Sequence, residues 1–188
     1  MSIRINPLVR AGAFVASLLL ACGAQAQEKA APHKYVGATQ CGNCHKSEPK
    51  GNQLGKWQAS LHAKAFETLA GEKALAVAKE KKLAKAPQES PECLKCHTTG
   101  YGKDAALFAA TFKKEDGVSC EACHGPGSDY KAMGVMKDKA AAVAAGLVVP
   151  DEKTCTACHN AESPTFKGFN FKEMAAKVAH PKPAKAKS

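Results

Sequence analysis

The residues best suited to chemistry in this 188-residue chain are cysteines and histidines that recur at one fixed spacing. Eight of the nine cysteines fall into four copies of Cys-x-x-Cys-His, namely CGNCH at 41–45, CLKCH at 93–97, CEACH at 120–124 and CTACH at 155–159. Two thiols at this spacing can add to the two vinyl groups of a haem, and the adjoining imidazole can then ligate the iron. The pattern predicts four covalently bound haem c groups, each with one iron.

Each copy supplies two attachment thiols and one proximal iron ligand. The predicted attachment residues are Cys41, Cys44, Cys93, Cys96, Cys120, Cys123, Cys155 and Cys158. The predicted proximal ligands are His45, His97, His124 and His159. Paired cysteines could also form disulfides or zinc sites, but neither alternative requires a histidine after the second cysteine. Four of the seven histidines occupy that position, which favours haem.

Every haem iron has a second axial position, and only three histidines remain for four of them. At least one iron must therefore be five-coordinate or take another ligand, such as methionine. His62 and His180 are the leading distal candidates, because His62 falls on the apolar face of a predicted helix and His180 ends the last one. The further candidates are His33, Met133 and Met136, whereas Met174 is expected to pack among phenylalanines.

The composition indicates that side chains alone do not build the interior. From Gln27 onward, Leu, Val and Phe account for 22 of 162 residues and Ile is absent. That is about 14%, below the roughly 20% expected of a chain that folds on its own apolar core. Porphyrin rings would supply the missing apolar volume. The formal charge of +10 suggests an anionic partner, but haem propionates would add about eight negative charges, so nucleic acid is not expected.

Periodicity and turn residues predict a mainly α fold with extensive loops and little or no sheet. Helices are expected over 53–70, 72–84, 140–145 and 171–179, and the only candidate strand is 147–149. The fold class is a compact multihaem cytochrome wrapped around four covalently bound haems. Glycines 117, 125 and 127 around the third motif suggest close backbone packing there.

The first 26 residues are expected to be a signal peptide, with two arginines, an apolar run over 11–21 and the small-residue site Ala24-Gln25-Ala26. An alternative is a lipoprotein signal that leaves a lipid anchor on Cys22. No segment is long enough to span a bilayer permanently. We expect one tetrahaem domain over 27–180, a disordered basic tail over 181–188, and export to the periplasm.

Several segments resemble the tetrahaem cytochrome c-554 family of exported multihaem cytochromes. They are WQASLHAKAFETL at 57–69, CLKCHTTGYG at 93–102, GVSCEACHGPG at 117–127 and FNFKEM at 169–174. With the first and last motifs, they follow the order of that family along nearly the whole mature chain. The resemblance implies a helical fold around haems stacked in close pairs and a role as a periplasmic electron carrier.

The resemblance also implies ligands. His62 would be the distal ligand of the fourth haem, His180 would serve the third, and the second haem, on His97, would be five-coordinate. The family places a histidine about ten residues after the third motif as ligand to the first haem, whereas this chain has Gly134 there. The sixth ligand of the first haem is therefore left to Met133, Met136 or His33.

Electron transfer between redox protein donors and acceptors is the favoured function, because irons with both axial positions filled cannot easily bind substrate. One alternative is a reductase of nitric oxide or another nitrogen oxide at an open iron on His97. Another is a haem module that binds a gas without turnover. Lysines 79, 81, 82 and 85 could form a docking face for an acidic partner.

Overall fold

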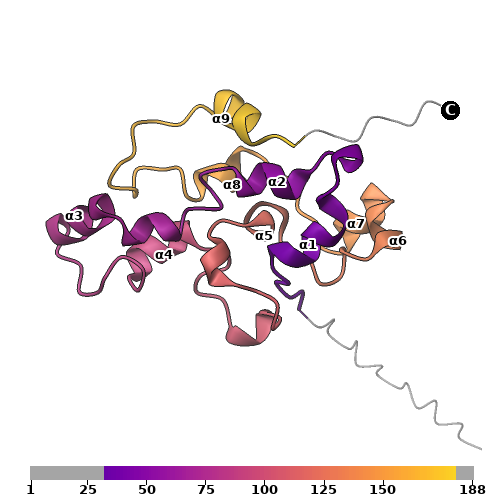
Figure 1. Ribbon diagram of the computed structural model, residues 1–188, viewed down its shortest axis with the longest axis horizontal. Coiled ribbons are helices and arrows are strands. Elements are labelled where there is room, and N and C mark those ends of the chain that lie inside the picture. The colour runs from indigo at the N-terminus through magenta and orange to yellow at the C-terminus, as the bar shows by residue number, and fades with distance from the viewer. Residues whose placement is uncertain (1–31, 181–188) are drawn as a thin grey trace, which may run out of the picture. The chain divides into compact units, whose positions relative to one another are not determined.

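The computed structural model describes residues 32–180, which form short helices joined by long loops (Figure 1). These residues fall in one compact unit, Pro32–Ser188. The α-helices are α1 (Ala38–His45), α2 (Gln53–Gln58), α3 (Glu72–Glu80), α4 (Pro91–His97), α5 (Cys120–His124), α6 (Met133–Met136), α7 (Lys139–Ala144), α8 (Glu152–Thr156) and α9 (Phe171–Val178). The 3₁₀-helices are η1 (Glu48–Lys50), η2 (Glu67–Ala70), η3 (Ala105–Leu107) and η4 (Lys114–Asp116).

The predicted fold class, mainly α with little or no sheet, is confirmed. Within residues 32–180 no strand forms, and the only β-type pairing is an isolated bridge between Tyr35 and Phe108. The run 147–149 is irregular, so the candidate strand was wrong. The predicted signal peptide (1–26), the Cys22 anchor and the basic tail (181–188) lie outside the described residues.

The helices predicted near the C-terminus are confirmed. Helix α7 begins one residue before the predicted start, where the Asp138 side chain accepts hydrogen bonds from the N–H groups of Ala140 and Ala141. Gly146 follows that helix with φ +97°, the left-handed conformation that glycine adopts readily after a helix. In α9, Asn170 caps the first turn in the same way.

The helix predicted over 53–70 was wrong in its middle. Helix α2 ends at Gln58, residues 59–66 form turns, and η2 follows. Leu61, which the periodicity assigned to the apolar face, is 83% exposed, whereas Leu69 is buried. The helix predicted over 72–84 also ends early, at Glu80, and Lys82 follows it with φ +52°.

Tertiary hydrogen bonds explain why residues 59–66 leave the helix. The carbonyl oxygen of His62 accepts the N–H of Val118 at 3.0 Å, and that of Ala65 accepts a hydrogen bond from His97 Nδ1 at 2.7 Å. In a continuous helix these oxygens would instead accept N–H groups four residues further along the chain. His62 therefore lies in a turn that is held by two other parts of the chain.

The side-chain core of the described region is small. Its buried apolar residues are Val36, Ala38, Leu69, Pro87, Tyr130 and Ala142. Several large apolar side chains are exposed instead, including Leu75, Val149 and Phe166. So few buried apolar residues rarely stabilise a chain of this length. This agrees with the amino-acid composition, which indicated that another source of apolar volume is needed.

A buried threonine ties the end of α4 to the start of α5. The hydroxyl of Thr99 donates to the carbonyl oxygen of Gly117 at 2.9 Å and accepts the N–H of Ser119 at 2.8 Å. The backbone N–H of Thr99 donates to the same Gly117 oxygen at 2.9 Å. Thr99 and Ser119 are each 3% exposed, so water cannot replace these bonds.

Substituting Thr99→Val should destabilise the folded protein by about 1–3 kcal/mol, because the Ser119 N–H loses its buried acceptor. Chemical denaturation of the haem-loaded protein measures the change as a lower midpoint. The matched control is Thr165→Val at an exposed position, which should leave the midpoint near that of the wild type. Equal midpoints for the two variants would show that the Thr99 bonds do not hold α4 to α5.

Candidate functional site

All four Cys-x-x-Cys-His motifs adopt helical turns. The first and second motifs end α1 and α4, the third is the whole of α5, and the fourth begins in α8. In the fourth motif the His159 N–H still donates to the Cys155 carbonyl at 3.0 Å, so the helical turn extends through the histidine. Residues i, i+3 and i+4 share one face of a helix. Each motif therefore presents two thiols and one imidazole on the same side.

Local sequence explains where two of these helices begin. Pro91 lies in the first turn of α4, where its missing N–H costs nothing and its fixed φ favours a helix. Helix α8 starts with a capping box, in which the Asp151 side chain accepts the Thr154 N–H at 2.9 Å and the Thr154 hydroxyl accepts the Asp151 N–H at 3.3 Å.

Three proximal histidines have their Nδ1 atoms in hydrogen bonds to oxygen acceptors. The acceptors are Ala65 O for His97 at 2.7 Å, Val148 O for His124 at 3.2 Å and Gln53 Oε1 for His45 at 3.2 Å. Because a carbonyl oxygen only accepts, Nδ1 carries the proton and Nε2 keeps its lone pair. Metal-binding histidines commonly have this arrangement. The Nε2 atoms are thus prepared to ligate iron.

Two proximal histidines each face a second histidine. The ring centroids of His62 and His159 are 6.0 Å apart, and those of His124 and His180 are 6.5 Å apart. Metal–imidazole bonds are about 2 Å long, so two rings on opposite sides of one metal have centres about 6 Å apart. Both pairs are compatible with two axial ligands of one iron.

Both distal candidates favour the neutral imidazole. Burial lowers the pKa of His62, and the nearby His159 lowers it further. Burial also lowers the pKa of His180, followed by the effects of His124 and Lys56. Burial disfavours the charged form, and only a neutral imidazole has a lone pair for a metal. The environment of each ring therefore suits a ligand role.

The remaining distal candidates are not paired in this way. His33 Nδ1 lies 2.7 Å from Asp129 Oδ2, and the other edge of its ring lies against Gly146. On α6, Met133 is 66% exposed and Met136 is half-buried. Among the described residues, neither His45 nor His97 has a second imidazole paired with its ring. Met174, expected to pack, is instead 38% exposed.

The turn at 59–66 serves several motifs at once. Its Ala65 oxygen holds His97 of the second motif, and its His62 ring faces His159 of the fourth. The His62 carbonyl also binds Val118, two residues before the third motif. Gly117 is required there, because a Cβ on it would come within 2.8 Å of the His62 oxygen, and its φ is +65°. One short segment therefore connects three motifs.

No disulfide joins any two of the eight motif cysteines, and thiols of different motifs interact. A hydrogen bond with Cys120, together with burial, raises the pKa of Cys41. Burial and then the Cys155 thiol raise the pKa of Cys123. Burial, followed by the neighbouring Cys96 thiol, raises the pKa of Cys158 to about 11. These contacts link the motifs in the order first, third, fourth, second, which differs from their order in the sequence.

The donor set fits haem c better than the two alternatives. Within residues 32–180 the cysteines form no disulfide, and no three His, Cys, Asp or Glu side chains are grouped to hold a bare metal ion. Paired thiols and an adjoining imidazole on one helical face match the two vinyl groups and the iron of one porphyrin. The small apolar core leaves room for such rings.

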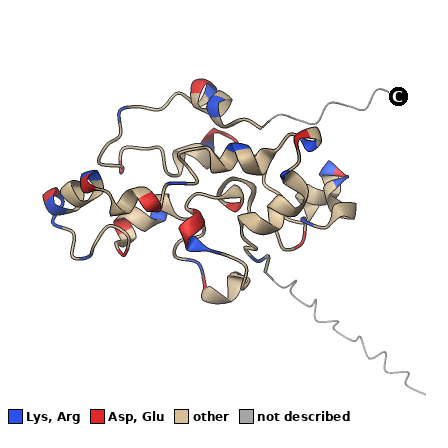
Figure 2. Ribbon diagram, in the orientation of Figure 1, with Lys and Arg blue, Asp and Glu red and all other residues tan. Residues whose placement is uncertain are grey.

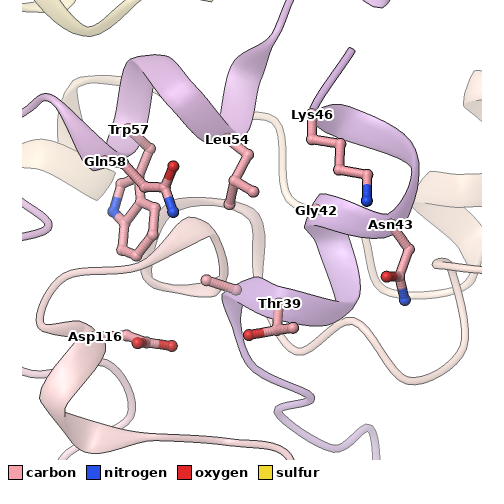
Figure 3. A pocket seen from close by; sticks show the side chains of 9 residues that line it. Thr39, Gly42, Asn43, Lys46, Leu54, Trp57, Gln58 and Asp116 are labelled. Atoms are coloured by element: carbon pink, nitrogen blue, oxygen red, sulfur yellow. The ribbon is translucent and has the colours of Figure 1, made fainter.

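Two cavities lie beside the motifs, away from their thiols. One, of about 260 Å³, lies between α1 and α2, where Trp57 and Leu54 face Thr39 and Gly42 (Figure 3). Asp116 lines it too, and burial raises the pKa of its carboxyl group. The other, of about 330 Å³, adjoins α4 at Leu94 and residues 98–103. Neither is lined by a motif cysteine or histidine.

The lysines proposed as a docking face are exposed but mixed with acids. They are Lys79, Lys81, Lys82 and Lys85, on and after α3. Glu72 and Glu80 share this helix, and Glu80 forms an ion pair with Lys81 at 3.6 Å. Figure 2 shows both charge signs alternating along this part of the chain. Charge alone does not single it out for an acidic partner.

Comparison with known proteins finds one similar family and one similar protein. The family described as "Cytochrome c554 and c-prime" matches residues 40–125, which include the first three motifs. Cytochrome c-554 of Nitrosomonas europaea is 29% identical over 175 residues, covering 80% of this chain and 72% of that protein. Residues 40–125 of this chain are thus similar to the cytochrome c-554 family. No solved structure gives a significant match to this cytochrome.

The comparisons support the coarse function. They indicate a c-type cytochrome that carries electrons, with haem c as its covalently bound, iron-containing group. The comparisons do not favour a nitrogen-oxide reductase or a gas-binding module. Within residues 32–180, no helix has the length and apolar character needed to cross a bilayer.

The sequence interpretation missed one residue, Glu121, which lies between the two cysteines of the third motif. A charged side chain at a variable position of Cys-x-x-Cys-His normally indicates a solvated surface. Glu121 is instead 2% exposed. The only signal of its burial in the sequence is the set of glycines around the motif, which permit close backbone approach.

Proposed function

We propose that this cytochrome is a periplasmic tetrahaem electron carrier in which residues 27–180 form one domain. Each haem, when bound, supplies an iron that alternates between Fe(III) and Fe(II) by taking one electron from a reduced donor protein and giving it to an oxidised acceptor. The observation that carries the proposal is the pairing of His62 with His159 and of His124 with His180. The signal-like sequence over 1–26 supports export.

The four motifs would hold one haem each. His159 and His62 would be the axial ligands at the fourth motif, and His124 and His180 at the third. Two imidazoles leave no vacant position, so these sites transfer electrons without binding substrate. Their support is the ring spacing and the lowered pKa of each distal histidine.

The first and second motifs would hold irons that lack a histidine pair. We propose that the iron on His97 is five-coordinate, as the resemblance to the family implies. For the iron on His45, Met136 is the better methionine candidate, because it is half-buried whereas Met133 is largely exposed. His33 is the weaker candidate, since its ring lies between Asp129 and Gly146.

The contacts among thiols support a path for electrons. The interacting pairs are Cys41 with Cys120, Cys123 with Cys155, and Cys158 with Cys96. The first and second motifs would then be the two ends of this path. Redox proteins that dock near either end could exchange electrons without contacting the sites between them.

Coulometric titration of the exported protein tests the carrier function. We expect four electrons per chain, full reoxidation by a small outer-sphere oxidant, and a mass that exceeds the mature polypeptide by four haems. Nitric oxide should not bind the two irons with paired histidines, because these irons have no vacant position, so any binding should be confined to the irons on His45 and His97. Uptake of fewer than four electrons, or a mass without four added haems, would contradict the tetrahaem carrier.

Removing a distal histidine should change the spin state of one iron in four. In His62→Ala and His180→Ala, electron paramagnetic resonance should show the loss of one low-spin signal and a gain of high-spin iron, because each variant leaves an imidazole ligand missing. The control, His33→Ala, should retain both of these low-spin signals. An unchanged spectrum in either distal variant would remove that histidine from the ligand set.

A further inference from the structure

The third motif contains a buried carboxylate that three backbone amides hold in place. Glu121 Oε1 accepts the N–H of Val36 at 2.8 Å and of Gly127 at 2.7 Å, and Oε2 accepts the N–H of Gly37 at 2.8 Å. Hydrogen bonds to a charged acceptor are stronger than neutral ones. With 2% of its surface exposed, Glu121 exchanges none of these bonds with water.

These bonds connect two motifs that are distant in the sequence. Val36 and Gly37 directly precede α1, which carries the first motif, whereas Glu121 belongs to α5 and the third motif. The approach is close, since a Cβ on Gly127 would come within 3.2 Å of Glu121 Oε1 and 3.3 Å of the Val36 side chain. One side chain thus fixes the start of α1 against α5.

No lysine, arginine or histidine in the described part of the chain forms an ion pair with Glu121. Its charge reaches the surrounding groups. After burial and the Cys41 thiol, Glu121 is among the causes that raise the pKa of Tyr130. It also contributes, after the Cys120 thiol and burial, to the raised pKa of Cys41. The negative charge therefore acts on thiols of both motifs, Cys41 and Cys120.

We propose that Glu121 is a positioning residue that sets α1 against α5 and lowers the reduction potential of the haems at the first and third motifs. This inference rests on the proposed tetrahaem function. Ferric haem carries one more positive charge than ferrous haem, so a nearby buried carboxylate stabilises the oxidised form. Electrons at these two sites are thereby driven towards the fourth and second motifs.

The test is a spectropotentiometric titration of the exported, haem-loaded Glu121→Gln variant. Two of its four reduction potentials should rise. At a fixed ambient potential, each rise should make the ratio of reduced to oxidised haem about tenfold larger. For a one-electron couple, this is about 59 mV. The control is Glu152→Gln, which removes an exposed carboxylate three residues before Cys155 and should shift the potentials far less, because water screens that charge.

Glu121→Asp separates charge from position. This variant keeps the negative charge but has a shorter side chain. The denaturation midpoint should therefore fall, while the reduction potentials should stay near those of the wild type. If the glutamine variant loads four haems and its potentials match the wild type, the inference is overturned while the tetrahaem function stands. If the wild-type protein itself lacks four haems, the proposed function fails.

The wild-type protein offers a second test if Glu121→Gln does not fold. The third and fourth sites are proposed to have the same histidine ligands, but only the third adjoins Glu121. The signal lost in His180→Ala identifies one haem, and the signal lost in His62→Ala identifies another. In the wild type, the first of these haems should have the lower reduction potential. The opposite order would overturn the inference.

Discussion

Attachment of a rigid porphyrin at three points of one helical turn is the constraint on which this structure depends. Two thioether bonds and one iron–imidazole bond require the cysteines and the histidine on a single helix face. A turn or two of helix is enough for this, and α5 is no longer than its motif. The apolar rings would then take the place of the aliphatic core, which agrees with the small number of apolar side chains buried among residues 32–180. Polar contacts to the motifs consequently do much of the positioning.

Those polar contacts cross between motifs instead of staying within them. The turn at 59–66 orients His97 through the Ala65 oxygen and brings the His62 ring to His159, while Thr99 joins α4 to α5. Glu121 joins α5 to the start of α1. Each motif is thus contacted by a residue that also contacts another motif. The four motifs consequently follow a different order in space from their order in the sequence. Fixed spacing between neighbouring sites is what electron transfer through a chain of haems requires.

The sequence predicted whatever depends on local spacing. Cys-x-x-Cys-His indicated haem attachment, and the helix predicted over 140–145 differs from α7 by one residue at each end. It failed where a distant partner decides the outcome. The helix over 53–70 breaks because Val118 and His97 bind carbonyl oxygens that periodicity assigns to the helix, and Glu121 is buried because backbone amides from 36–37 come to it. The proposal of His62 as a ligand started from a helix face, yet its ring faces His159 from a turn.

X-ray diffraction at the iron absorption edge, from crystals of the exported protein, tests the central claim most directly, because anomalous scattering locates each iron independently of the polypeptide. The account predicts four iron positions in the order first, third, fourth and second motif, with imidazoles on both sides of the iron at the third and fourth. Fewer than four positions, or irons of the first and second motifs as nearest neighbours, would contradict it.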